Sequence, residues 1–163
     1  MLSTVQPPTT PFASPFRPPP TAFPWPNGSA YTALTTLRRL GVKVTRVERA
    51  EIWILGDEGD TRDFVQRVEA NESLFNPNKH QLHVLEERRP REGEAWISTA
   101  LPDSAGADDL RRIGRPISGI SSGSRFVGWR LFSNGNTPCV RAVVEEAVEK
   151  LLCNPAIERA TMR

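Results

Sequence analysis

Two histidines are the residues best suited to bind a metal ion in this 163-residue chain. His80 and His83 stand three residues apart in a segment, Lys79 to Leu85, whose pattern predicts a strand. Side chains three apart on a strand point to opposite faces, so the two rings cannot converge on one ion. We therefore interpret both as surface histidines and expect no metal site.

Serine chemistry is the next candidate, because a serine nucleophile needs a histidine and an acid held beside it. Ser104, Ser118 and Ser133 have no histidine and acid at a spacing that identifies such a triad. The glycine-containing loops Gly56–Gly59 and Ser121–Ser124 match neither the phosphate-binding loop nor the dinucleotide fingerprint, and they predict hairpin turns. These patterns favour structural roles for both groups.

A cluster of charged residues lies on a predicted short helix, Ala105 to Ile113. Asp108 and Asp109 are close to Arg111 and Arg112 there, and ordinary surface pairing accounts for all four. We expect no catalytic residue, no cofactor-binding residue, no metal ligand and no cofactor. An enzyme with a site assembled across the two halves of the chain is the least favoured functional hypothesis, because it needs convergent ionisable groups.

The two cysteines, Cys139 and Cys153, are expected at the ends of one helix. Their separation of 14 residues corresponds to about 21 Å along a helix, which is far beyond the reach of a disulfide. The pattern predicts two reduced thiols, with Cys153 as a small core residue.

Charge and hydropathy exclude several classes of protein. The chain has 21 Lys and Arg against 19 Asp and Glu, a surplus too small to indicate nucleic-acid binding. The arginines at 88, 89 and 91 are neutralised by neighbouring glutamates, so residues 88–94 predict a solvated linker rather than a phosphate-binding patch. No run approaches the roughly 20 apolar residues that cross a bilayer, and the first residues lack the features of a signal peptide. We expect a cytoplasmic protein without membrane partners.

Prolines concentrate in the first residues of the chain, where nine of the 15 lie between Pro7 and Pro26. Such a segment favours extended conformations without regular hydrogen-bond ladders. Residues 1–28 are expected to form a disordered tail, or one draped over the body through its aromatic residues, which are Phe16, Phe23 and Trp25. A proline-rich ligand for a recognition module is the less favoured interpretation.

The strongest helical signal is in the last residues, Thr137 to Arg163. Apolar residues recur there with the spacing of one helix face: Val140, Val143, Val144, Ala147, Val148, Leu151 and Leu152. Thr137 and Pro138 are typical of a helix start, and Asn154 before Pro155 predicts the stop. Residues Ile157 to Met162 then predict an edge strand.

Three short motifs, one of them from this ending, occur twice in the chain. Leu37–Gly41 recurs as Leu110–Gly114, Trp53–Leu55 recurs loosely as Trp129–Leu131, and the Asn-Pro pair at 76 recurs at 154. The three matches occur in the same order, and the offset between the copies drifts only slightly along the chain, which is typical of two copies of one fold unit. Chance similarity between amphipathic helices is the competing explanation. We predict a tandem repeat with units at 29–87 and 95–163.

The predicted elements indicate an α+β fold. In the first unit, a helix stopped by Gly41 precedes two strands, 42–47 and 51–55, joined tightly at 48–50, and then a helix at 61–75. In the second unit, the expected strands are 95–101, 117–120 and 126–132, with helices at 105–113 and 137–153. This order matches the ferredoxin-like split βαβ pattern. The opening strand of the first unit is either missing or hidden in the proline-rich lead.

Each unit of about 55 residues is only marginally stable alone and leaves one face of its sheet bare. We predict that the two sheets stack face to face. The side chains expected in that contact are Trp53, Leu55, Trp129 and Leu131.

At these residues the chain resembles the small PurS-type subunit of phosphoribosylformylglycinamidine synthase, the amidotransferase of purine biosynthesis. The ending Leu151-Leu152-Cys153-Asn154-Pro155-Ala156-Ile157-Glu158 is similar to the family ending, and residues 34–85 are similar to its portion from helix to last strand. The family's opening Gly/Asp-Pro-x-Gly loop is not matched in the first unit. The resemblance covers about two thirds of the body.

The resemblance implies a non-catalytic bridging subunit, which holds the synthetase and glutaminase subunits together so that ammonia passes between them. It also implies a possible homo-oligomer, although two copies in one chain can replace the usual dimer. The alternative hypothesis is a free-standing regulatory module of the same fold that binds a small metabolite between its units.

Overall fold

The computed structural model describes residues 8–9, 28–57, 61–72, 75, 83–85, 87, 89–98 and 120–163. Several predicted features lie outside these ranges. They are the short helix at 105–113, His80, Ser104, Ser118 and the pair Asp108 and Asp109.

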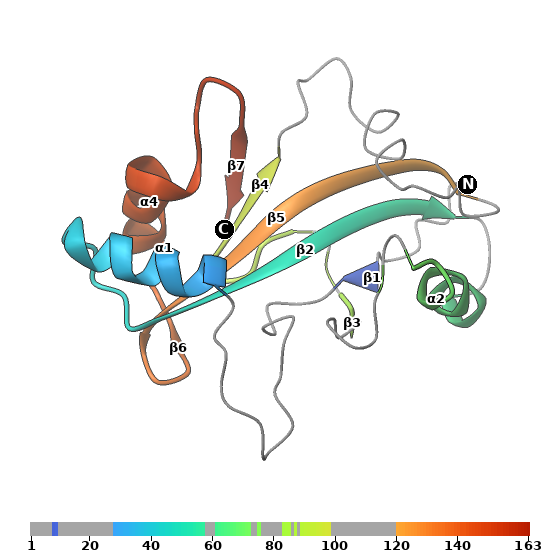
Figure 1. Cartoon of the computed structure of the whole chain (residues 1–163), viewed down its shortest axis with the longest axis horizontal. Coiled ribbons are helices and arrows are strands. Elements are labelled where there is room, and N and C mark those ends of the chain that lie inside the picture. Colours follow the sequence, from blue (N-terminus) through green and yellow to red (C-terminus); the bar gives the residue numbers. More distant parts are fainter. Residues whose placement is uncertain are drawn as a thin grey trace.

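The described elements form one antiparallel sheet with helices packed against it (Figure 1). The strand order is β3-β1-β2-β5-β4-β7, and β6 pairs with the end of β5. The architecture is α+β, as predicted. The strands are β1 (Pro8–Thr9), β2 (Arg46–Asp57), β3 (His83–Val84), β4 (Glu94–Ser98), β5 (Ile120–Asn134), β6 (Thr137–Pro138) and β7 (Arg159–Met162). The helices are α1 (Gly28–Arg39), α2 (Thr61–Glu69), α4 (Arg141–Ala147) and the π-helical turn η1 (Val148–Leu152).

The centre of the sheet is one long ladder between β2 and β5. It runs from Arg46 opposite Phe132 to Gly56 opposite Ser122, with an irregularity at the last residues of β2. The prediction of two short strands on either side of a link at 48–50 is therefore wrong, and so is the hairpin turn at Ser121–Ser124. These polar stretches lie inside strands, because the antiparallel partner supplies the backbone hydrogen bonds that a turn would otherwise supply.

The predicted face-to-face stacking of two sheets is also wrong. β2 and β5 are neighbours within one sheet, so their paired residues share a face. Trp53 lies opposite Arg125 and Trp129 lies opposite Arg49. Both tryptophans consequently point to the same side of a single sheet.

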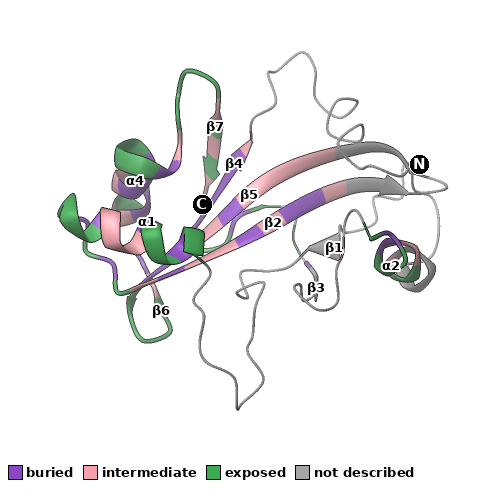
Figure 2. Ribbon diagram, in the orientation of Figure 1, coloured by how far each residue is buried: buried purple, intermediate pink, exposed green. Residues whose placement is uncertain are grey.

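The main core lies between that side of the sheet and the helices α1, α4 and η1 (Figures 1 and 2). Leu37 of α1 and Leu131 of β5 are fully buried, and Ala147 meets them from α4. The other buried members are Ala33, Val42, Val44, Val47, Ala95, Ile97, Cys139, Val144, Val148 and Leu152.

A second, smaller core lies on the opposite face. Ile52, Leu85 and Trp96 are buried there, and Ile54 and Phe126 pack against them. The rings of Trp96 and Phe126 are tilted, with centroids 5.8 Å apart. Both faces of the long ladder are therefore apolar along part of their length, as the residues from Ile52 to Leu55 indicate.

Helix α1 ends as predicted, but it buries a narrower face than its sequence suggests. Ala30, Ala33 and Leu37 are buried, whereas Tyr31 is 58% exposed and Leu40 is 42% exposed. Gly41 has a φ of 82°, the left-handed conformation that stops the helix.

The last helix begins later than predicted. Thr137 and Pro138 form β6, the N–H of Cys139 donates to Leu131 O, and α4 starts only at Arg141. Its apolar stripe is confirmed at Val144, Ala147 and the first residue of η1, while Val140 is 60% exposed. The chain leaves the helix before Asn154 and forms β7, as predicted.

Strand β4 lies close to the strand predicted at 95–101. The proline-rich lead contributes β1, which lies between β3 and β2 in the sheet. Among the described residues, no helix is both long enough and apolar enough to cross a membrane.

Candidate binding pocket beside Trp129

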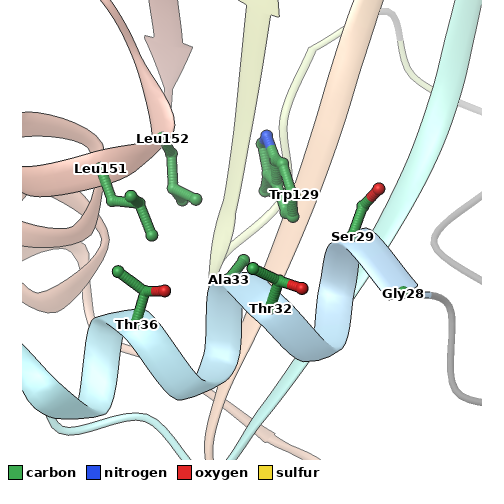
Figure 3. A pocket seen from close by; sticks show the side chains of 8 residues that line it. All are labelled: Gly28, Ser29, Thr32, Ala33, Thr36, Trp129, Leu151 and Leu152. Atoms are coloured by element: carbon green, nitrogen blue, oxygen red, sulfur yellow. The ribbon is translucent and has the colours of Figure 1, made fainter.

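A pocket of about 400 Å³ lies where α1, β5 and η1 meet (Figure 3). Helix α1 supplies one wall of small and hydroxyl-bearing residues, β5 supplies an indole ring, and η1 supplies two leucines. The lining residues are Gly28, Ser29, Thr32, Ala33, Thr36, Trp129, Leu151 and Leu152. The pocket thus has one polar wall and two apolar sides, and no lining side chain in the described part of the chain is charged.

The indole of Trp129 is positioned by the strands on either side of β5. Arg49 of β2 and Ala95 of β4 lie directly opposite Trp129 in the ladder. The guanidinium of Arg49 lies 5.7 Å from the ring centroid, within cation–π range. Figure 3 shows the ring almost edge-on, with Leu151 and Leu152 across from it. One face of the ring is therefore turned toward the leucines.

Three charged residues, Arg49, Glu51 and Arg125, lie near Trp129 or Trp53 on the same face of the sheet. Burial lowers the pKa of Arg49, and the nearby charge of Glu51 opposes that shift. Glu51 also pairs with Arg125, whose guanidinium lies 6.0 Å from the ring centroid of Trp53. Each tryptophan of this face is therefore accompanied by an arginine from the neighbouring strand.

Helix α1 is held in place at its C-terminal end. Arg38 donates from Nε to Val44 O at 3.1 Å and from Nη2 to Thr45 O at 2.9 Å. Lys150 of η1 donates to Leu40 O at 3.0 Å, which links the two helical walls directly. Because Thr32 and Thr36 are four residues apart, both hydroxyls lie on the same side of the anchored helix.

The opposite wall is a widened helical turn. Cys153 N–H donates to Val148 O, five residues earlier, at 3.2 Å. Leu152 is buried, whereas the neighbouring Leu151 is 39% exposed at the edge of the pocket. Single π-helical turns of this kind occur frequently at functional sites.

A second polar arrangement lies on the other face of the sheet. Glu48 of β2, Arg130 of β5 and Glu94 of β4 are directly opposite one another across three strands. Arg130 donates to Glu94 Oε1 through Nε at 3.0 Å and Nη2 at 2.7 Å, and Arg91 N–H donates to Oε2 at 2.9 Å. The Glu94 side chain is only 1% exposed. Its assignment to a solvated linker at 88–94 was therefore wrong.

Glu48 shares this row but is less completely buried. Arg46 Nη1 donates to Glu48 Oε1 at 2.6 Å, and the Arg46 guanidinium lies 3.8 Å from the Phe132 ring centroid. Burial raises the pKa of Glu48, while Arg46 and Arg130 act in the opposite direction. The row is an ion-pair network within the sheet, and its groups are engaged with one another.

The linker arginine at position 89 is exposed. Arg89 donates to Glu87 Oε2 at 2.7 Å, and this hydrogen bond is the main reason that the pKa of Glu87 is lowered. The pair is solvent-exposed, in agreement with the predicted neutralisation of these arginines by glutamates.

Both cysteines are free thiols, as predicted. Cys139 is fully buried in the core before α4 begins, and burial raises the pKa of its thiol. Cys153 follows η1, is half-buried and packs against the main core, so it lies at the edge of the core in which it was predicted. Burial and the charge of Glu158 both raise the pKa of the Cys153 thiol.

Two further candidate residues, His83 and Ser133, lie in the described part of the chain, on different strands. His83 lies on β3, at the edge of the sheet, and Ser133 is exposed near the end of β5, where its hydroxyl donates to Thr137 O at 3.4 Å. Among the residues that the structure describes, no three His, Cys, Asp or Glu side chains are placed to hold a metal ion.

Sequence reasoning missed the pocket because its walls are far apart in the chain. The spacing of Thr32 and Thr36 is a local signal, but nothing nearby indicates that Trp129 lies beside them.

A comparison of the chain with protein-family models finds no match, and a comparison with curated proteins finds none.

Proposed function

We propose that the chain consists of two PurS-like modules in tandem. Its role would be that of a non-catalytic assembly subunit, which bridges the synthetase and glutaminase subunits of a phosphoribosylformylglycinamidine synthase complex. The proposal rests on the resemblance of the repeated segments and on one observation of geometry, the register of the central ladder.

The register of the ladder agrees with the spacing of the sequence repeat. Trp53 and Trp129 occupy matching positions in the proposed repeat. Glu51 and Val127 lie directly opposite each other in the ladder, and they are the same number of residues apart in the sequence as the two tryptophans. A local two-fold axis at that pair therefore exchanges each residue of β2 with its repeat counterpart in β5. The pairs Trp53–Arg125 and Arg49–Trp129 are then equivalent, which agrees with the arginine found beside each ring.

The outer strands extend the same relationship. Thr9 of β1 pairs with Ile52, and Trp96 of β4 pairs with Gly128, which is the counterpart of Ile52. His83 of β3 pairs with Thr9, just as Thr161 of β7 pairs with Trp96. The interval from His83 to Thr161 also equals the interval between the two Asn-Pro pairs. Unrelated halves would have no reason to share these registers.

The arrangement also supports a modified ferredoxin-like unit. In the proposed first half the strands lie in the order β3-β1-β2, and in the proposed second half in the order β7-β4-β5. In each half this is the last strand, the opening strand and the long strand, which corresponds to three adjacent positions of the split βαβ sheet. The long strand of the other half takes the place beside it. The two halves thus complete each other edge to edge, which removes two exposed strand edges.

The proposal is tested with the full chain and the two larger subunits of the synthase. We expect the chain to co-elute with both in size-exclusion chromatography when glutamine and nucleotide are present. Glu145→Gln, on the exposed surface of α4, serves as a variant that leaves the fold intact. Separate elution of the chain at micromolar concentrations under all ligand conditions would contradict the assembly role.

The alternative, a regulatory module that binds a small metabolite, is favoured by a different observation. Its expected place between stacked sheets does not exist, but the pocket beside Trp129 offers a concave site of suitable size. A rise in melting temperature with a small metabolite, without binding to the synthase subunits, would favour this function.

A further inference from the structure

We propose that the pocket beside Trp129 binds a small, uncharged, planar heterocycle, which stacks on the indole and hydrogen-bonds to the hydroxyl wall of α1. This inference goes beyond the assembly role and does not depend on it.

The size of the pocket limits the ligand. A volume of about 400 Å³ lies at the lower end of the range for small-molecule sites, which is roughly 300–1,000 Å³. One ring system with a modest substituent fits such a space. A nucleoside is about the largest ligand of this kind.

The arrangement of the apolar sides favours a flat ligand. The face of Trp129 that looks toward η1 lies across the pocket from Leu151 and Leu152 (Figure 3). A planar ring inserted between them contacts the indole on one side and the leucine methyl groups on the other. Offset stacking of this kind adds to the gain from burying apolar surface.

Arg49 leaves the ligand-facing side of the indole open. It approaches Trp129 from β2, which is on the opposite side of β5 from β4 and β7. The guanidinium therefore stabilises the indole from the β2 side, and the side toward η1 remains for a ligand. The nearby charge of Glu51 compensates the charge of Arg49 within the sheet.

The side chains that line the pocket favour an uncharged ligand. Thr32 and Thr36 carry hydroxyls, and each hydroxyl can donate one hydrogen bond and accept others. Among the lining residues that the structure describes, no side chain bears a charge, so a buried anionic or cationic group would lose water without an ionic partner there. A heterocycle edge with adjacent donors and acceptors matches this wall.

The experiment uses the purified full chain with adenosine and cytidine as probes and adenosine monophosphate as the charged comparison. Saturation-transfer NMR reports the ring protons, and titration gives the dissociation constant. We expect saturable binding of at least one nucleoside below about 1 mM, a modest affinity for a shallow site. The phosphate should weaken binding or leave it unchanged.

Variants locate the site. Thr36→Leu fills the pocket and should weaken binding at least tenfold, and Trp129→Phe should weaken it by removing the larger stacking surface. Trp53→Phe is the matched control, because Trp53 holds the equivalent repeat position on the same face and does not line the pocket. It should leave the dissociation constant within about twofold, close to the additivity error of distant sites.

Three results would overturn the inference. The first is no saturation by either nucleoside at millimolar concentration, with the wild-type chain folded by circular dichroism. The second is equal binding by Thr36→Leu and wild type, when both proteins have cooperative thermal transitions. The third is markedly tighter binding of the monophosphate, which would assign the pocket to an anion. None of these results bears on co-elution with the synthase subunits, so the two proposals fail separately.

Discussion

Replacing Glu94 by glutamine should be the most destabilising conservative change in the sheet. Its carboxylate is 1% exposed and accepts two hydrogen bonds from Arg130 and one from the backbone N–H of Arg91. The glutamine amide can present its oxygen to only one of these donors, so its NH₂ group must face the other donor. Arg130 also loses the negative charge that compensates it in a half-buried site.

The magnitude follows from typical costs. Breaking a buried ion pair by removing one partner costs about 3–5 kcal/mol, and the partial exposure of Arg130 lowers this toward about 2–3 kcal/mol. Urea unfolding followed by circular dichroism, at a pH where glutamate is ionised, measures this loss directly through the midpoint and slope of the transition.

The matched control is Glu145→Gln, which breaks the exposed pair with Arg141 on α4. That change should alter the free energy of unfolding by no more than about 0.5 kcal/mol. A double-mutant cycle with Arg130→Met isolates the coupling between Arg130 and Glu94. A loss below about 1 kcal/mol for Glu94→Gln, or a coupling near zero, would refute the reasoning that this pair holds β4 to β5.

The remaining predictions concern a glycine, a carboxylate and a thiol. Gly93→Ala should lower the free energy of unfolding in urea by more than about 2 kcal/mol, because the φ of Gly93 is 79° and the new Cβ would lie 2.7 Å from Pro138 Cβ. The control is Gly135→Ala, where φ is 53° but the space is open, and it should cost only about 1 kcal/mol. Burial raises the folded-state pKa of Glu48. The stability that Glu48 contributes is therefore present below its unfolded-state pKa and is lost as pH rises through its folded-state pKa. Glu48→Gln should flatten this part of the curve of unfolding free energy against pH, and an unchanged curve would contradict the raised pKa. A thiol reagent should modify the half-buried Cys153 in the native chain but modify Cys139 only on unfolding, as read by mass spectrometry; equal labelling rates would contradict the burial of Cys139.

Local signals predicted the ends of elements better than the pairing of strands. Gly41 stops α1 and Asn154 precedes the turn into β7, because both act through the backbone of their own neighbourhood. The polar stretches at 48–50 and 121–124 were misinterpreted as turns. In the sheet, the Glu51 carboxylate pairs with Arg125 from a different strand, and no local window of sequence contains that partner.

The same reason explains the error about stacked sheets. Alternation along β2 correctly indicates that both faces are partly apolar, but alternation does not specify whether a neighbour lies above the sheet or beside it. In the proposed repeat, a ladder whose register matches the repeat interval places the two tryptophans on one face of the same sheet. The pocket could not be predicted, since Thr36 and Trp129 meet only after that ladder forms.

In the proposed tandem repeat, the two halves match in backbone register, but their side chains differ on the face opposite the main helices. Arg130 and Glu48 belong to the ion-pair row, yet their repeat counterparts are Ile54 and Ser124. One half of that face therefore depends on a buried carboxylate, and the other on the apolar cluster around Ile52. A homodimer of identical modules cannot differ in this way, because a substitution there appears in both halves at once. We propose that fusion of the two modules in one chain permits two unlike surfaces on a symmetric frame, a property that suits the proposed bridge between two different subunits.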